Sequence, residues 1–588
     1  MKTRKLLSLA LALIMALGML AACGSSDPVD SGPTATPGAL PTPPSVTPPP
    51  IIEDTPTDSV LLELGLDENL RFLETRKITV AIFDRENDGG TPPDDNVFSN
   101  WIKDQVLEAH NIEIEWVRIG RWTGTDDYSR LFAANAVPDV GYEYDFEIFM
   151  RAFSEMGGIL DLYPYMSEYS NIFPNLFDLL GTEFIYWNMD PETNQTFAFP
   201  GKRMAYNIVG TFIREDWLNT LGLDEPTTIQ EFEDCLVAFR DNAELLLGEN
   251  ADRMIPYMMT HDVRWNYRPL LDGHFPSDLS DRDIYVNGSL EYLLTHPANK
   301  ETIRTLNKWY NMGLLWYDFG LYTNETLGSI ADDRIKQGHV GVFNGNTDQP
   351  YRSGENSHQA KMQEFVGPDA AYIAISPFPN DSGEVSRLVS QDVDRFIFLP
   401  HTNTEPIASL LYLDFITRRE VREYLQIGEE GINHIVHDNG AIEKLPATGE
   451  WIQNSPDNID YTITINISNA APSLGDPVRE GLSAALAFPG TDPKYIAKTF
   501  EANQNPATTR TTPNFGLGAI EAESGVIIDL NTKRNNMFIN AIVAAPADFD
   551  AVYDAGMQDL MASGLRAAVD ERIARWELYY GDAEFISD

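Results

Sequence analysis

The chain has 588 residues, of which 89 are Asp or Glu and 42 are Lys or Arg, so its formal net charge is −47 at pH 7. A surface this acidic repels nucleic-acid phosphates and anionic lipid headgroups, which disfavours both as partners. Cys23 and Cys235 are the only cysteines, so we expect disulfides to contribute nothing to stability. Cys235 lies in a helical pattern, which predicts a small buried hydrophobe.

The N-terminus has the features of a secretory signal peptide, predicted for residues 1–22. Three basic residues precede a mostly apolar run over residues 6–22, which is too short to span a membrane. The motif LAAC at residues 20–23 resembles the bacterial lipobox, in which the cysteine is diacylated and becomes the mature N-terminus. An ordinary signal peptide beside an incidental cysteine is the alternative. We expect acyl chains such as palmitate on Cys23 to hold the protein on the extracellular side of the cell membrane.

Residues 23–60 are predicted to form a lipid-anchored linker. Pro, Ser, Thr and Gly dominate this segment, and such a composition cannot bury a core. The folded part, from about residue 61, exceeds 500 residues, which is too many for one hydrophobic core. At least two lobes are therefore expected.

The folded part opens with an alternation of strands and helices. Residues 76–84 are apolar on both faces, as in a strand covered by helices, and residues 96–110 follow with apolar side chains at helical spacing. Residues 111–119 alternate between apolar and acidic, residues 128–136 read as a short helix, and residues 138–146 read as a third strand. This order predicts a parallel α/β sheet with right-handed crossovers.

Five further stretches carry a resemblance to a known family. They are LFAANAVPDV at 131–140, GGILDLYPYM at 157–166, the segment 196–241 with its REDWLNTLGL and PTTIQEF motifs, the helix pattern at 293–315, and the closing helices at 549–581. Together they resemble the extracellular solute-binding proteins, family 1, of ABC importers, especially lipoproteins that capture oligosaccharides. The resemblance implies an α/β fold of two periplasmic-binding-protein-like lobes (type II), with a ligand cleft between them and extra C-terminal helices.

The resemblance also implies how the chain divides and works. Lobe 1 is predicted over residues 61–198 plus about 372–432, and lobe 2 over residues 199–371 plus about 433–588. The lobes would close by a hinge around an oligosaccharide and deliver it unchanged to ABC permease subunits, with the protein acting as a monomer. No enzyme activity and no cofactor are expected. Many relatives carry a calcium loop, but residues 241–254 lack its alternating oxygen ligands and central glycine, so we expect no metal there.

Candidate ligand-binding residues follow from where strands should end. Ligands in open α/β sheets bind beyond the carboxyl ends of the strands. Aromatic planes cover the apolar faces of a sugar ring, while Asp, Asn and Arg bind its hydroxyls. Ordinary burial is the alternative for each aromatic residue. The candidates are Asp84 and Arg85 after the first strand, Trp122 in a Gly/Thr loop, Tyr142 and Tyr144 after the third strand, Trp265 at a helix start, and Asn344 and Asn346 after a strand of the second lobe.

Two other functions remain open at this point. The same scaffold could bind peptides or another solute, because fold does not fix the ligand. An anchored polysaccharide-degrading enzyme would need two carboxylates at a defined separation, but 89 acidic residues make such pairs unavoidable by chance. The chain has no Gly-x-Ser-x-Gly or His-Glu-x-x-His motif, and His434 and His437 are interpreted as solvated or structural.

Overall fold

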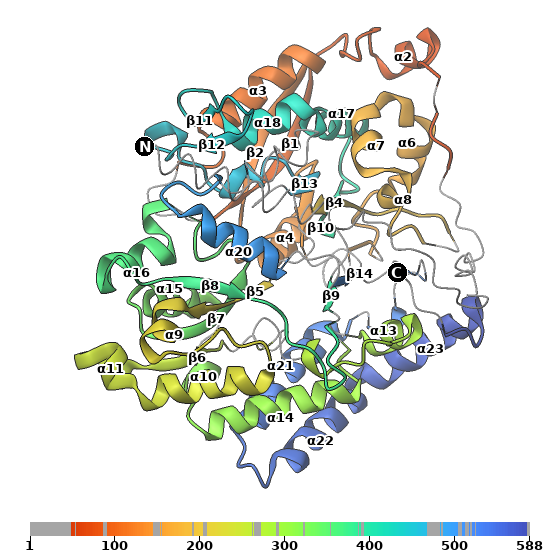
Figure 1. Cartoon of the computed structure of the whole chain (residues 1–588). Coiled ribbons are helices and arrows are strands. Elements are labelled where there is room, and N and C mark those ends of the chain that lie inside the picture. Colours follow the sequence, from red (N-terminus) through yellow and green to blue (C-terminus); the bar gives the residue numbers. More distant parts are fainter. Residues whose placement is uncertain are drawn as a thin grey trace, which may run out of the picture.

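The structure is a computed structural model, and its buried apolar side chains form two separate clusters. It describes residues 49–584 except 53, 86–90, 145–152, 155, 191–192, 204–208, 261–262, 264–271, 290–292, 322–323, 353, 386, 390–392, 467–482, 484–485, 504–508, 512–514, 516, 518–519 and 524. The first core draws on residues 61–199 and 397–463, and the second on residues 212–378 and 496–576. Each core surrounds its own sheet (Figure 1), so the expectation of two cores is confirmed.

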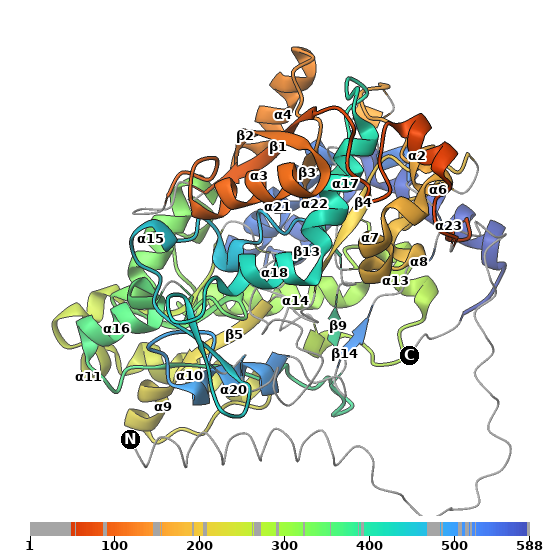
Figure 2. The same cartoon turned by 90° about the horizontal axis from the view of Figure 1, so that it is seen from above.

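The predicted parallel start of the first sheet is confirmed. Strands β1 (Arg76–Asp84) and β2 (Ile112–Gly120) pair in parallel over their whole length, from Arg76↔Ile112 to Asp84↔Gly120. The connecting helix α3 (Val97–His110) is capped by Asn96, whose side chain accepts from the backbone N of Phe98 and Ser99. Helix α4 (Gly124–Ala133) then leads to β3 (Gly141–Glu143). Figure 2 shows α3 beside these strands.

A separate four-stranded sheet, built from β3 and three strands from later in the chain, adjoins the β1-β2 pair, and we call the two together the first sheet. A parallel bridge between Val80 and Val140 joins β1 to the approach of β3. Strand β10 (Val393–Phe398) pairs antiparallel with both β3 and β4 (Phe199–Arg203), and β13 (Ile465–Asn466) pairs parallel with β4. The sheet is therefore mixed, which local patterning does not reveal because β10 and β13 lie hundreds of residues downstream.

Helices cover the first sheet, and one buried carboxylate ties two of them together. Asp414, which is 1% exposed, lies on α17 (Pro406–Thr417) and accepts from Nδ2 of Asn175 at 2.7 Å and from the backbone N of Leu176 at 2.9 Å, at the start of α7 (Pro174–Leu180). Burial raises the pKa of Asp414 to about 6. The remaining elements are α2 (Asp58–Leu64), α6 (Tyr163–Glu168), α8 (Thr182–Ile185), α18 (Arg419–Ile427), β11 (His434–Val436) and β12 (Ile442–Lys444).

The second sheet has the strand order β6-β7-β5-β8. Strand β5 (Val209–Arg214) runs antiparallel to β7 (Val340–Asn346) and β8 (Tyr372–Ile375), and β6 (Ile255–Met258) is parallel to β7. Trp217 lies in this core and is 2% exposed, and Cys235, which is 4% exposed, is buried as predicted. Burial also raises the pKa of the Cys235 thiol to about 11, so this thiol is unreactive at neutral pH.

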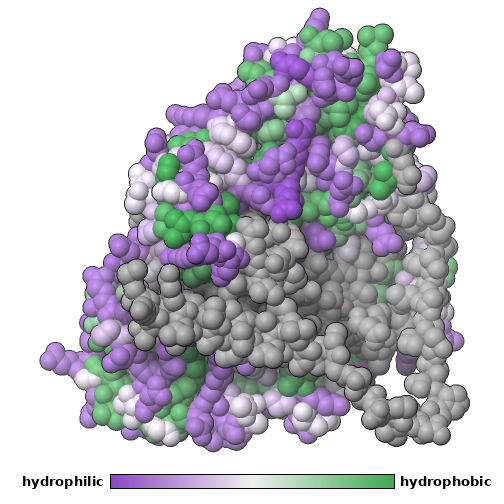
Figure 3. Space-filling model, turned by 45° about the horizontal axis from the view of Figure 1, so that its top comes forward, coloured by the Kyte–Doolittle hydropathy of each residue, from purple (hydrophilic) through white to green (hydrophobic). Residues whose placement is uncertain are grey.

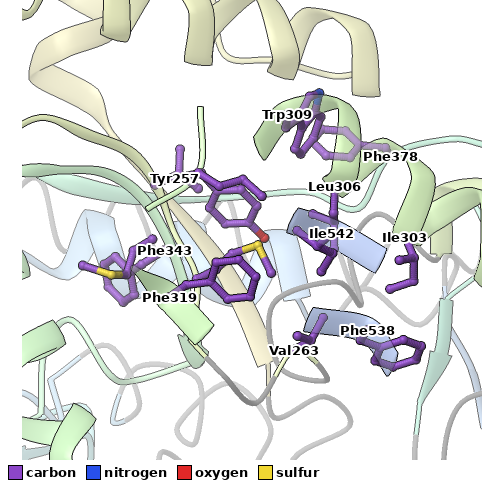
Figure 4. Close-up of a cluster of buried hydrophobic side chains, with 14 of the residues drawn as sticks. Tyr257, Val263, Ile303, Leu306, Trp309, Phe319, Phe343, Phe378, Phe538 and Ile542 are labelled. Carbon is purple, nitrogen blue, oxygen red and sulfur yellow. The ribbon is translucent and has the colours of Figure 1, made fainter. Parts of the chain in front are cut away.

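Helices from two parts of the chain share this second core. Figure 4 shows Trp309 and Leu306 of α14 in the same cluster as Phe538 and Ile542 of the C-terminal α21. Trp576 of α23 is fully buried against Tyr285 and Phe515, which confirms the predicted docked C-terminal helix. The helices are α9 (Glu215–Leu221), α10 (Ile229–Asp241), α11 (Ala243–Leu247), α13 (Asp281–Asn287), α14 (Pro297–Asn311), α15 (Asn324–Lys336), α16 (His358–Val366), α20 (Pro493–Asn503), α21 (Ile527–Val543), α22 (Phe549–Leu560) and α23 (Arg566–Tyr580).

The chain passes between the two cores three times. Core membership changes between Phe199 and Phe212, between Phe378 and Ile397, and between residues 463 and 496. The predicted lobe boundaries stay a prediction. Because residues 372–375 pair with β5 and residues 461–463 pack in the first core, we propose to place the second crossing after residue 378 and the third after residue 463.

Where Figure 3 is coloured by hydropathy, hydrophilic side chains predominate on this face, with smaller hydrophobic patches between them. Among the residues that the structure describes, no helix combines the length and the apolar character that crossing a membrane requires.

The substitution Asp414→Asn should change how stability depends on pH. The ordinary pKa of 3.8 describes the unfolded carboxyl, and the folded value of about 6 means that the folded chain holds the proton more tightly. Wild-type stability from this group therefore falls as pH rises through this window. We expect the unfolding free energy of wild type relative to the variant to increase by about 2 kcal/mol from pH 7.5 to pH 4.5, measured by urea denaturation. An unchanged difference would contradict this assignment.

Candidate ligand-binding site

Polar and aromatic residues gather where β1, β2 and β3 end. Asp84 closes β1 and Arg85 follows it, while Arg121 and Trp122 follow β2. The backbone N of Arg121 donates to the carbonyl oxygen of Asp84 at 2.9 Å, which joins the two strand ends. Because parallel strands end at one edge of a sheet, Arg121 and four of the predicted residues lie at the same edge. The four are Asp84, Arg85, Trp122 and Tyr144.

Arg121 lies among three aromatic rings. Its guanidinium carbon is 4.3 Å from the ring centroid of Tyr144, 4.9 Å from that of Trp122 and 5.4 Å from that of Phe83. Phe83 and Tyr144 are themselves stacked, with centroids 6.0 Å apart and planes 10° apart. Trp122 is 67% exposed. We call Arg121, Trp122 and Tyr144 the aromatic platform: it offers ring faces for apolar surface and a guanidinium that can donate to oxygen.

Arg85 is engaged by a buried carboxylate. Its Nε donates to Oδ2 of Asp460 at 2.6 Å and its Nη2 donates to Oδ1 at 3.0 Å. The Asp460 side chain is fully buried, and burial alone would raise its pKa, but the charges of Arg85 and Arg395 hold the pKa below its ordinary value. Asp460 thus stays ionised and fixes the orientation of Arg85 beside the platform.

Tyr142 lies beneath the surface of the site and contacts the backbone of residues that form it. It is fully buried, its hydroxyl accepts from the backbone N of Phe83 at 3.0 Å, and it donates to the backbone oxygen of Asp460 at 3.3 Å. A side chain without exposed surface cannot touch a ligand in this conformation. Asp84 lies at the rim, with Oδ2 at 3.7 Å from Nη1 of Arg118. Both stay predictions as ligand contacts.

The predicted asparagines of the second lobe lie inside strand β7 and not after it. This corrects their predicted position: pairing with β5 continues to Val209↔Asn346, so the strand includes both residues and ends at Asn346. They are two residues apart and therefore share a face. Nδ2 of Asn344 donates to the hydroxyl of the buried Tyr257 at 2.8 Å. As ligand contacts, both stay predictions.

Two of the predicted site residues, Trp265 and Cys23, lie outside the described residues.

The segment 241–254, expected to lack a calcium loop, forms helical turns, and the Asp241 carboxylate accepts from Nε of Arg240 at 2.8 Å. In the described ranges, no group of three or more His, Cys, Asp or Glu side chains could hold a metal ion. His434 is buried against the carbonyl of Ile427, and His437 lies 2.8 Å from Glu443.

Solved structures with the same fold are solute-binding proteins. The alginate-binding protein AlgQ2 matches 86% of this chain and 98% of its own, with a TM-score of 0.60 and 14% identity. An HMO-binding, ABC-transporter-associated solute-binding protein from Bifidobacterium longum infantis matches 86% of this chain and 99% of its own, with a TM-score of 0.59 and 17% identity. Streptococcus pneumoniae FusA, as an EF-hand mutant in complex with fructo-nystose, matches 86% of this chain and 100% of its own, with a TM-score of 0.60 and 12% identity.

These matches show that the chain has the two-lobe α/β fold of ABC-transporter solute-binding proteins, with additional C-terminal helices. The resemblance found in the sequence is confirmed at that level. No protein-family model and no curated protein matches the chain.

The sequence did not identify Arg121, Arg395 or Asp460 as part of this site. Arg121 is next to the predicted Trp122 in the sequence, and a cationic residue beside a predicted aromatic contact in a loop could have indicated it. Arg395 and Asp460 lie more than 250 residues beyond Tyr142, and only the strand order β3-β10 and the fold of the loop before β13 bring them here.

Tyr142→Phe should lower the free energy of unfolding by about 1–3 kcal/mol, because the buried backbone N–H of Phe83 would lose its acceptor. The partly exposed Tyr144→Phe is the matched control and should change it by less than about 0.5 kcal/mol. Equal effects of the two substitutions, measured by urea denaturation, would contradict the supporting role of Tyr142.

Proposed function

We propose that this chain is the substrate-binding protein of an ABC importer and that it captures an oligosaccharide. The proposal rests on one arrangement, the aromatic platform at the carboxyl ends of parallel strands, with the indole of Trp122 67% exposed. The shared fold supports it, since AlgQ2 is alginate-binding and FusA is in complex with fructo-nystose. Ligands of open α/β sheets bind at this edge.

Capture would proceed by stacking, hydrogen bonding and closure. A sugar ring would lie on the exposed face of Trp122, and its hydroxyl oxygens would accept from Arg121. The asparagines on β7, donors and acceptors at once, would meet the other side of the ligand when the second lobe closes over it. The permease subunits would then recognise the closed, liganded form.

Asp394 and Asp460, two buried carboxylates of the network that contacts the platform, are unsuited to act as the general acid of a glycosidase. A glycosidase needs one carboxyl group with a raised pKa as its general acid. Burial alone would raise the pKa of Asp394 and Asp460, but the guanidiniums that contact them hold both values below the ordinary range. We therefore propose binding without catalysis.

A peptide is the second candidate ligand, and it would call for a charged pair left free for its termini. Arg85 and Asp460 form a charged pair at this edge of the sheet, but they bind each other at 2.6 and 3.0 Å, and the Asp460 side chain is fully buried. This arrangement favours a sugar over a peptide.

The proposed location is the outer face of the cell membrane. We propose that Cys23 is diacylated and becomes the mature N-terminus when residues 1–22 are removed. The proline-rich segment up to residue 60 would then hold the folded lobes, as a monomer, away from the membrane. Two or more acyl chains give stable anchoring where one would be marginal.

Trp122→Ala should weaken oligosaccharide binding by about 1–3 kcal/mol, or 5- to 150-fold, because it removes a stacking surface at the centre of the site. Binding is measured by calorimetry and by tryptophan fluorescence against neutral oligosaccharides, acidic oligosaccharides and peptides. Tyr317→Ala, which removes an equally exposed aromatic ring packed on Tyr310 in the second lobe, is the control and should leave affinity unchanged. Saturable binding of peptides alone would overturn the sugar proposal.

Cys23→Ser should release the protein from the membrane fraction into the medium, because the acyl chains would have no attachment point. Incorporation of radiolabelled palmitate into wild type, and its loss in the variant, checks the modification directly. Membrane retention of the variant would contradict the lipid anchor.

A further inference from the structure

The three crossings between the lobes are joined at one buried carboxylate on the first lobe. The crossings leave this lobe at the end of β4, arrive at the start of β10 and leave again at the end of β13. Arg203 is the last residue of β4, Asp394 is the second residue of β10, and Asn466 is the last residue of β13. All three side chains meet.

Asp394 accepts from each crossing. Its Oδ1 accepts from Nη2 of Arg203 and from Nδ2 of Asn466, the latter at 2.9 Å, and its Oδ2 accepts from Nε of Arg395 at 2.6 Å. The Asp394 and Arg395 side chains are fully buried. Burial alone would raise the pKa of Asp394, but Arg203 and Arg395 hold it below its ordinary value, so the carboxylate is charged at neutral pH.

The local backbone is built for this junction. The register of β10 against β4 shifts between Val393 and Phe396, and such a β-bulge allows the neighbouring Asp394 and Arg395 both to point inward. A Cβ on Gly201 of β4 would lie 2.3 Å from the carbonyl oxygen of Ile463, so only glycine fits where β4 passes the chain entering β13.

The same network continues to the ligand site. Nη1 of Arg395 donates to the carbonyl of Ile459 at 3.0 Å and lies 3.5 Å from Oδ1 of Asp460, the carboxylate that holds Arg85. The guanidinium of Arg395 also lies over the ring of Tyr144, with 4.9 Å from its carbon to the centroid. A continuous chain of buried contacts therefore runs from the aromatic platform to all three crossings.

We propose that Asp394 is a positioning residue that clamps the three inter-lobe crossings together and sets the orientation of the lobes. That Asp394 holds the crossings together is a claim beyond the proposed function. It rests on the proposed function only in assuming that the lobes close around a ligand. Hinge residues absorb the backbone change while the rest of each lobe moves as a unit. With the crossings held at a common root, Arg203, Asp394 and Asn466 move as one unit with the first lobe.

The test measures the distance between the lobes without any ligand. Spin labels are placed on the exposed positions of Asp104→Cys in α3 and Leu245→Cys in α11, in the full chain carrying Cys23→Ser, where the buried Cys235 stays unlabelled. We expect Asp394→Asn to broaden the distance distribution at least about two-fold, because the crossings lose their shared charge. Since no ligand is needed, this result is independent of whether any oligosaccharide binds.

Asp414→Asn is the matched control at pH 7.5, since it removes another buried carboxylate of the same lobe that contacts α7 and none of the crossings. It should lower the unfolding midpoint and leave the distance distribution unchanged. A distribution as narrow in Asp394→Asn as in wild type, or one equally broad in both variants, would overturn the clamp.

Arg203→Gln is a milder perturbation of the clamp than Asp394→Asn, because Arg203 is partly exposed and Asp394 still accepts hydrogen bonds from Arg395 and Asn466. We expect a smaller broadening in the same direction, and Arg203→Lys should restore much of the wild-type distribution by returning a positive charge. If Asp394→Asn does not fold, an unchanged distribution in Arg203→Gln would overturn the proposal by itself.

Discussion

Guanidinium groups paired with buried carboxylates in the first sheet are the interaction on which the rest of this molecule depends. Arg395 lies between Asp394 and Asp460 with no exposed surface, and each carboxylate binds a second arginine as well. In a low-dielectric interior, such charges are tolerated only when their partners satisfy them with good geometry. The strands that supply the partners, β4, β10 and the loop before β13, are therefore held at defined positions relative to β1.

This constraint relates the fold to the proposed function. Among the described residues, the buried apolar side chains form two separate clusters, and the chain crosses from one to the other three times. Strand β13 has only two residues and β4 has five, which gives few backbone hydrogen bonds at the junction. Side-chain charge takes over part of that role at Asp394. On its other side, the network fixes Arg85 and contacts Tyr144, so the surface offered to a ligand and the root of the crossings are joined by one set of contacts.

Local patterns predicted the parts of the structure that local forces determine. Residues 76–84 and 112–120 form strands because their apolar periodicity matches a covered sheet, and α23 docks through the fully buried side chain of Trp576. The patterns could not predict the insertion of β10 beside β3, because that pairing spans some 250 residues. For the same reason the aromatic residues near the platform were found, whereas their charged partners at residues 395 and 460 were not. Tyr142, one of the predicted ligand contacts, is buried because Arg395 and Phe83 pack on its ring.

Small-angle X-ray scattering of the full chain, with and without a saturating oligosaccharide identified by calorimetry, tests the central claim most directly. If two lobes close around a sugar bound at the carboxyl ends of β1, β2 and β3, the radius of gyration falls on saturation, and it does so in wild type but not in a variant that no longer binds. A radius of gyration that stays constant while the sugar binds stoichiometrically would contradict the account.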